Sequence, residues 1–131
     1  MFLDASAMIA IIVREPDGAA LGTRVLEAER VHTSAIAVYE ALLGVVRVRN
    51  ATVAGAEEVI DDFLRAMRVE IIPVTAEIGR GAIRAFERFG RGRHPARLNM
   101  GDCFAYACAR ALNVPLLFKG EDFAQTDIAT A

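Results

Sequence analysis

Hydrophobic residues in this chain form short apolar runs that alternate with longer stretches of helical spacing. The short runs predict β-strands at residues 1–4, 30–34, 69–74 and 114–118. The longer stretches predict helices at residues 6–15, 16–29, 35–49, 52–67, 75–90 and 100–113. Strands that alternate with helices in this way are typical of a parallel sheet that is covered on both faces.

We therefore expect an α/β fold. A length of 131 residues is that of one domain, so residues 1–131 are taken as a single unit. Its central parallel sheet would have four to five strands, flanked by helices on both faces, and the fifth would be a short edge strand near residues 127–129.

Local signals support several of the helix boundaries. Pro16 is suited to open the second helix, Ser34 is suited to cap the third, and Thr52 stands where the fourth would begin. Residues 91–99 contain Gly92 and Pro95 and predict a loop.

The composition indicates a protein that is not embedded in a membrane. No apolar run reaches the roughly 18 residues of a membrane span, and the apolar start is too short for a signal peptide and contains Asp4. We expect a cytoplasmic protein. Hydrophobic residues make up 54% of the chain, and part of that surplus would face a partner.

The two cysteines, Cys103 and Cys108, are five residues apart in a predicted helix. That spacing turns them away from each other, so we expect buried thiols and no disulfide.

Charge is unevenly distributed along the chain. The formal net charge is −2, but residues 80–97 contain Glu87 as their only acid and six arginines, which are Arg80, Arg84, Arg88, Arg91, Arg93 and Arg97. The arginine fork is well suited to phosphate. A solvated helix face is the simpler interpretation for Arg80 and Arg84.

Four acidic residues follow or precede the predicted strands at one edge of the sheet. Asp4 ends the first strand, Glu40 lies in the first two turns of the helix after the second, Asp102 lies in the first turn of the helix before the fourth, and Asp122 follows the fourth. In an open parallel sheet, ligands bind beyond the carboxyl ends of the strands. Asp127 is a possible fifth member of the group.

Each acid also has a structural explanation. Asp4 would cap a helix, Asp102 would interact favourably with a helix dipole, and Glu40 and Asp122 would be a solvated side chain and a turn residue. Carboxylates that converge repel one another unless a cation lies between them. Mg²⁺ and Mn²⁺ prefer such oxygen ligands, whereas two isolated histidines do not favour zinc.

Four segments together resemble the PIN-domain endoribonucleases, specifically the VapC-type toxins of bacterial VapBC toxin–antitoxin pairs. These segments are MFLDASAMIAII, SAIAVYEALLG, LNMGDCFAYACARALNVPLLFKGEDF and QTDI, and the resemblance spans nearly the whole chain. It implies Mg²⁺-dependent hydrolysis of RNA, and transfer RNA or ribosomal RNA would be the substrate. Mn²⁺ would be able to replace Mg²⁺.

The resemblance also implies the site residues. Asp4, Glu40 and Asp102 match the metal pocket, and Asp122 matches the fourth acid. Asp127 matches an accessory acid that only some relatives have. Such acids with two divalent ions would activate water and stabilise the attacking and leaving oxygens.

Ser6 matches a small hydroxyl residue of the family and would orient a water or a phosphate oxygen. Its structural alternative is a helix N-terminal cap. Arg91, Arg93 and Arg97 precede Asp102 and would bind the RNA backbone, whereas the helical spacing of Phe86 and Phe89 favours packing over base stacking.

A homodimer and a cognate VapB-type antitoxin are implied as partners, with no membrane. We place the antitoxin groove on apolar residues of the second to fourth helices, namely Leu21, Val25, Leu26, Leu42, Val45, Val46 and Val48.

Three other functions fit the sequence less well. A phosphoacceptor receiver domain would use Lys119, but it needs an acid at the end of the third strand, where the chain reads VEIIPVT. A haloacid-dehalogenase-type phosphatase needs an aspartate at the position of Ser6. A catalytically silent PIN-like module that binds RNA or protein remains as the alternative.

Overall fold

A four-stranded parallel sheet forms the middle of the molecule. The structure, a computed structural model, describes residues 1–131. The strands are β1 (Phe2–Leu3), β2 (Val31–Ser34), β3 (Val69–Ile72) and β4 (Leu116–Leu117), in the order β3-β2-β1-β4. Every adjacent pair is parallel, so the α/β fold with a central parallel sheet is confirmed.

The C-terminal segment adds a partial fifth strand. Thr130 forms an isolated parallel bridge with Leu116, supported by hydrogen bonds from the Leu116 amide to Ala129 and from the Ala131 amide to Leu116. The extension lies slightly later in the chain than the edge strand expected near 127–129.

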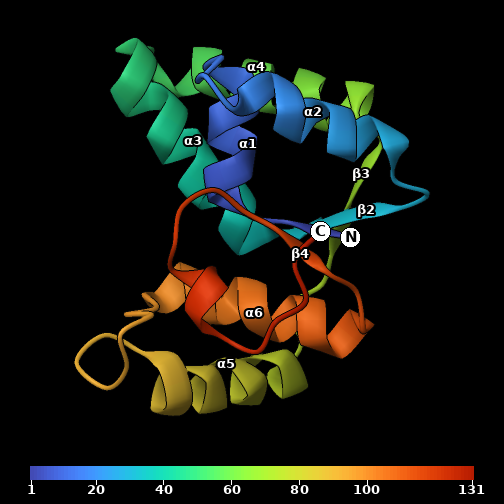
Figure 1. Ribbon diagram of the computed structural model, residues 1–131. Coiled ribbons are helices and arrows are strands. Elements are labelled where there is room, and N and C mark those ends of the chain that lie inside the picture. The colour runs from blue at the N-terminus through green and yellow to red at the C-terminus, as the bar shows by residue number, and fades with distance from the viewer.

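Helices cover both faces of the sheet, as Figure 1 shows. On one face lie α1 (Ala5–Ile12), α2 (Gly18–Glu27), α3 (Ala35–Arg49) and α4 (Val53–Ala66), and on the other lie α5 (Ala76–Phe89) and α6 (Met100–Leu112). A single 3₁₀ turn, η1 (Phe123–Gln125), follows β4.

The first two helices are shorter than their sequence pattern predicts. Helix α1 ends at Ile12, because Arg14 adopts a left-handed conformation with φ 59°. Helix α2 begins at Gly18, so Pro16 precedes the helix and does not open it. Ser34 and Thr52 cap α3 and α4 as expected, accepting from the amides of Ala37 and Gly55.

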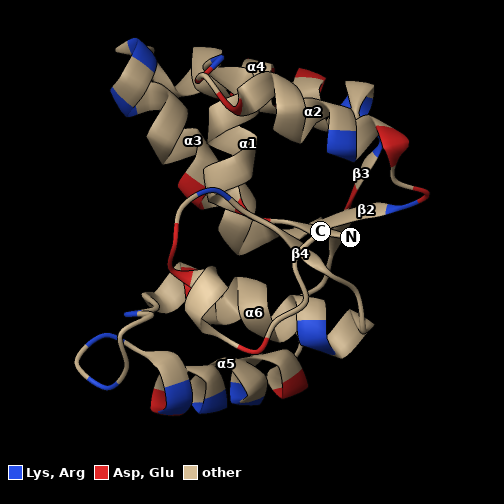
Figure 2. Cartoon of the chain, in the orientation of Figure 1, with Lys and Arg blue, Asp and Glu red and all other residues tan.

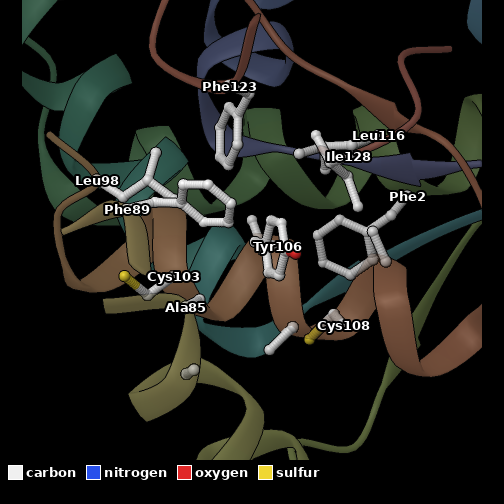
Figure 3. Close-up of a cluster of buried hydrophobic side chains, with 14 of the residues drawn as sticks. Phe2, Ala85, Phe89, Leu98, Cys103, Tyr106, Cys108, Leu116, Phe123 and Ile128 are labelled. Atoms are coloured by element: carbon white, nitrogen blue, oxygen red, sulfur yellow. The ribbon is translucent and has the colours of Figure 1, made fainter. Parts of the chain in front are cut away.

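Two hydrophobic clusters, one on each face, sandwich the sheet. The two-residue strands contribute to both, since successive side chains of a strand point to opposite faces. Phe2 and Leu116 join the α5–α6 cluster, which is drawn in Figure 3, and Leu3 and Leu117 join the α1–α4 cluster. Because all four are fully buried, short strands suffice to position the residues that follow them.

The prediction that seven apolar residues of the second to fourth helices form an antitoxin groove is wrong for three of them. Leu21, Val25 and Val45 are 8%, 2% and 0% exposed and belong to the α1–α4 core, so they are not accessible to a partner. Leu26 and Val48 are exposed at 69% and 53%. Helical spacing alone does not distinguish which apolar positions face the sheet.

Other expectations about side chains are confirmed. Cys103 and Cys108 are buried free thiols, and Phe89 packs in the α5–α6 core. Core packing is not confirmed for Phe86, which is 44% exposed. None of the helices has the length and apolar character that crossing a membrane requires.

Candidate active site

Asp4 lies directly after β1 and is 3% exposed. Its side chain caps α1, since Oδ2 accepts from the Ser6 amide at 2.9 Å and from the Ser6 hydroxyl at 2.5 Å. Burial raises the pKa of Asp4, and the hydrogen bonds from Ser6 oppose that shift. The carboxylate within the apolar start is therefore a buried helix cap.

Ser6 connects two segments that are far apart in the sequence. Its hydroxyl donates to Asp4 and accepts from the Lys119 amide at 3.0 Å, in the loop after β4. The structural alternative of a helix cap is wrong for Ser6, because Asp4 occupies the cap position and Ser6 is the second residue of α1. The Lys119 side chain pairs with Glu15 and, at 3.2 Å, with Asp17, which fastens the same loop to the turn before α2.

Glu40 projects from α3 toward the N-terminus of α6. Helix α3 can approach α1 closely because it has Gly44, where a Cβ atom would run into the side chain of Ile9. A Cβ atom at Gly101 would likewise overlap the Glu40 carboxylate. Gly44 therefore allows α3 to pack against α1, and Gly101 makes room for the Glu40 carboxylate at the start of α6.

Asp102 is held by a capping box at the start of α6. Asn99 Oδ1 accepts from the Asp102 amide at 3.0 Å, and Asp102 Oδ2 accepts from the Asn99 amide at 2.8 Å. Such reciprocal bonds satisfy two amides that a helix N-terminus leaves free. They also fix the direction of the Asp102 side chain.

Asp4, Glu40 and Asp102 line one cleft of about 380 Å³, together with Ser6 and Asn99. Burial raises the pKa of Glu40 to about 7, with further contributions from the charges of Asp4 and Asp102. Burial raises the pKa of Asp102 to about 6; the Asn99 amide opposes this shift, and Asp4 and Asp122 add to it. The structure thus brings together the three acids that the sequence predicted.

The two remaining predicted acids, Asp122 and Asp127, do not line the cleft. Asp122 is exposed, just before η1, and acts on the cleft through its charge, which raises the pKa of Asp102. Asp127 instead accepts from the Tyr106 hydroxyl at 2.6 Å and from Arg88 at 3.1 Å, one bond to each oxygen. Those bonds lower its pKa.

The side chains of Asp4, Glu40 and Asp102 are of the type that binds a hard divalent ion, but they are not close enough together to form its ligand set. Their donor atoms are carboxylate oxygens, which Mg²⁺ and Mn²⁺ prefer, and their raised pKa values reflect burial and repulsion that a cation would relieve. No three acidic, histidine or cysteine side chains are grouped closely enough to hold one ion.

The loop before α6 carries the predicted RNA-binding arginines. Arg91, Arg93 and Arg97 are exposed and line a shallow depression of about 470 Å³. Arg93 stacks over the Phe86 ring at 5.2 Å. Arg91 lines a cavity together with Asn99, which also lines the acidic cleft, and the charge of Arg91 lowers the pKa of Asp102.

Sequence reasoning missed two polar residues that line the cleft and one glycine beside Glu40. Asn99 has a detectable signal, since an asparagine three residues before an acid at a helix start is a capping pattern. Arg47 also lines the cleft and lies two turns after Glu40, on the same side of α3. Gly101 has no signal in a single sequence, because its importance depends on α3 packing nearby.

Known proteins resemble this chain over nearly its whole length. A family model described as the PIN domain matches residues 1–129. Ribonuclease VapC30 of Mycobacterium tuberculosis is 39% identical over 130 residues, covering 99% of this chain and 97% of that protein. Ribonuclease VapC of Mycolicibacterium smegmatis is 40% identical over 129 residues, covering 98% of each.

Solved structures share the fold at lower sequence identity. The M. tuberculosis toxin VapC20, described as cleaving the sarcin–ricin loop, has a TM-score of 0.78 at 18% identity, covering 99% of this chain and 97% of that one. A toxin–antitoxin complex from Klebsiella pneumoniae has a TM-score of 0.71 at 14% identity, covering 99% and 95%. At these identities the likeness concerns the fold.

Proposed function

Because this chain belongs to the PIN-domain family and, within it, to the VapC ribonucleases, we propose that it is a Mg²⁺-dependent endoribonuclease that acts as the toxin of a toxin–antitoxin pair. Mn²⁺ substitutes for Mg²⁺. The observation that carries the proposal is the meeting of three acids in one cleft: Asp4 from the end of β1, and Glu40 and Asp102 from helices on opposite faces of the sheet. A structural role for each acid alone does not account for their convergence.

Asp4, Glu40 and Asp102 would hold the first ion once their side chains moved closer together than they lie in this structure, and Asp122 would help to hold a second. A bound divalent ion supplies stabilisation of charge on a phosphodiester and lowers the pKa of water. The protein contributes the placement of the ligands: Ser6 fixes Asp4, and Asn99 fixes Asp102. The Ser6 hydroxyl is also within the cleft, where it orients a water or a phosphate oxygen.

Asp127 is a poorer candidate for the metal set. Each of its oxygens already accepts one hydrogen bond, which leaves a single lone pair on each for the accessory-ligand role that the acid has in some relatives. The proposal therefore rests on the other four acids.

RNA approaches the cleft from the arginine loop. Arg91, Arg93 and Arg97 bind phosphates of the backbone, which gives affinity without sequence choice. Transfer RNA and ribosomal RNA are both candidate substrates; VapC20, the structural neighbour, is described as cutting the sarcin–ricin loop.

The partners are a VapB-type antitoxin that blocks the cleft and a second copy of the chain. Support comes from the names of the relatives and from the exposed large hydrophobic residues, which include Leu26, Tyr39, Val53 and Ile83. We place the toxin in the cytoplasm, where its RNA substrates are.

Metal binding and cleavage are tested with separate variants. Mg²⁺ or Mn²⁺ should raise the melting temperature of the native protein, because it binds the folded cleft and not the unfolded chain, and Asp4→Asn should abolish that rise. Purified protein should cut structured RNA with Mn²⁺ present, and Asp102→Asn should not. Equal cleavage by both preparations would indicate a contaminating nuclease and favour the catalytically silent binding module.

A further inference from the structure

Positive charge is concentrated on the α5–α6 side of the molecule. Residues 76–112 contain seven arginines and three acidic residues, hence a net charge of +4, in a chain whose total is −2. Figure 2 shows the basic positions along α5, in the loop after it and on α6. The arginines of α5 and α6 do not line the acidic cleft, so any role of theirs in binding would be separate from it.

Three of these arginines line a cleft of their own between α5 and α6. Arg84 and Arg88 come from α5 and Arg110 from the C-terminal turn of α6, around a volume of about 330 Å³. Glu77 is the one acid among the lining residues. Arg84 and Arg110 form no ion pair, so positive charge is in excess there.

Arg88 is held in place by residues that do not belong to the acidic cleft. Its guanidinium donates to Asp127 and lies over the Phe89 ring at 4.6 Å. Asp127 is in turn fixed by Tyr106, a side chain that is 6% exposed and also lines the α5–α6 cleft. A guanidinium restrained in this way loses less conformational freedom when it binds an anion.

We propose that the Arg84–Arg88–Arg110 cleft is a second binding site for RNA phosphate groups, away from the point of cleavage. The inference rests on the proposed function and extends it, since the protein would bind RNA phosphates beyond those at the bond that is cleaved. Arg110 is eight residues from Asp102, or about 12 Å along α6 at the usual rise per residue. Arg91 follows the C-terminal end of α5, three residues after Arg88, so the arginines continue along the chain from this cleft to the loop before α6.

Asp127 acquires a definite role in this arrangement. It is a positioning residue for Arg88, through one hydrogen bond, and is itself positioned by Tyr106. The acid that the family resemblance placed near the metal thus contributes to holding the substrate.

The test measures RNA binding without cleavage. In an Asp102→Asn background with EDTA, the affinity for bulk transfer RNA is measured as salt is raised, and the slope of log K against log[salt] reports the phosphates contacted. Arg84→Gln with Arg110→Gln should reduce the magnitude of the slope by about 1 to 2. The matched control, Arg24→Gln with Arg30→Gln, removes the same charge from exposed positions elsewhere and should leave the slope nearly unchanged.

A second pair separates charge from packing. Arg84→Lys with Arg110→Lys keeps both charges and should retain most of the slope. A slope that falls equally in the glutamine and the control variants, or in the glutamine and the lysine variants, would overturn the proposal. Because the assay needs no catalysis, its outcome is independent of whether the native protein cuts RNA.

Discussion

At the scale of single residues, the site depends on acids that are kept close at an energetic cost. Asp4 is buried yet caps a helix, and Glu40 lies beside two other carboxylates with no hydrogen bond or ion pair of its own. Burial and repulsion disfavour their charged forms. Natural proteins retain such arrangements mainly where function requires them.

Gly101 is predicted to determine where Glu40 lies. In Gly101→Ala, the added methyl group overlaps the Glu40 carboxylate, which is the flexible end of a side chain and can move away. Stability should stay within about 1 kcal/mol of the native value, because alanine suits a helix better than glycine. RNA cleavage should fall on the order of 100-fold, since ligand geometry is lost.

Gly79→Ala is the matched control, because a Cβ atom at Gly79 in α5 meets nothing within 4 Å. Cleavage and thermal melting are measured for both variants. Native activity in Gly101→Ala would show that the position of Glu40 seen here is not required.

The raised pKa of Glu40 predicts how the stability of the metal-free protein depends on pH. Its pKa is about 7 when folded, against an ordinary value of 4.5, so the folded state binds the proton more readily. Ionisation therefore destabilises the fold as pH rises from about 4.5 to about 7, and acidification through that window restores stability.

The measurement is the melting temperature in EDTA across this window for the native protein and for Glu40→Gln. The glutamine variant should show a weaker rise on acidification; part of the rise persists because the pKa of Asp102 is also raised, to about 6. Superimposable pH profiles would contradict the assignment to Glu40.

At the scale of elements, helix N-termini gather at one edge of the sheet. Asp4 caps α1, Ser34 caps α3 and Asn99 caps α6. Asp4 directly follows β1 and Ser34 ends β2, whereas Asn99 lies three residues before Asp102. Free amides and the helix dipole at such ends favour negative charge. In α1 and α6 the capping bonds that begin the helix therefore also orient an acid, Asp4 in the first and Asp102 in the second.

Two caps with similar bonds allow that link to be tested. Asn99→Ala and Thr75→Ala remove the caps of α6 and α5, which accept at 3.0 Å and 3.2 Å, and each should cost about 1 kcal/mol of stability. Only Asn99→Ala should also reduce RNA cleavage, because it releases Asp102. Chemical denaturation and a cleavage assay on both variants measure the two effects, and equal activity losses would mean that stability alone is responsible.

At the scale of the whole molecule, the two faces of the sheet differ in character. One face carries α1–α4, and the other carries α5, α6 and the excess of arginine. Exposed large hydrophobic residues occur on both, for example Leu26 at 69% and Ile83 at 69%. Such surface suits association with other chains.

We predict that the isolated protein is a homodimer. Burial of part of this apolar surface against a second copy would stabilise the pair by the hydrophobic effect. Sedimentation equilibrium without antitoxin should give about twice the chain mass of 14.2 kDa. A mass of one chain at all concentrations would contradict the prediction.

The sequence by itself determined the order and type of the elements. Helix α3 was predicted at its observed bounds, and α4, α5 and α6 within one or two residues, because apolar spacing and N-cap residues are local signals. It also determined the acidic rim, since the carboxyl ends of parallel strands share one edge. Asp4, Glu40 and Asp102 meet there as predicted.

Only the tertiary structure decided which side chains face which neighbours. Val45 is buried, and Asp127 accepts hydrogen bonds from Tyr106 and Arg88. Gly101 lies so close to the Glu40 carboxylate that a Cβ atom would overlap it. None of these outcomes follows from local spacing, because each depends on an element far away in the chain. The physical reason is that helix periodicity determines only the direction in which each side chain leaves its own helix axis. Which residues the side chain then contacts depends on how the other elements pack against that helix.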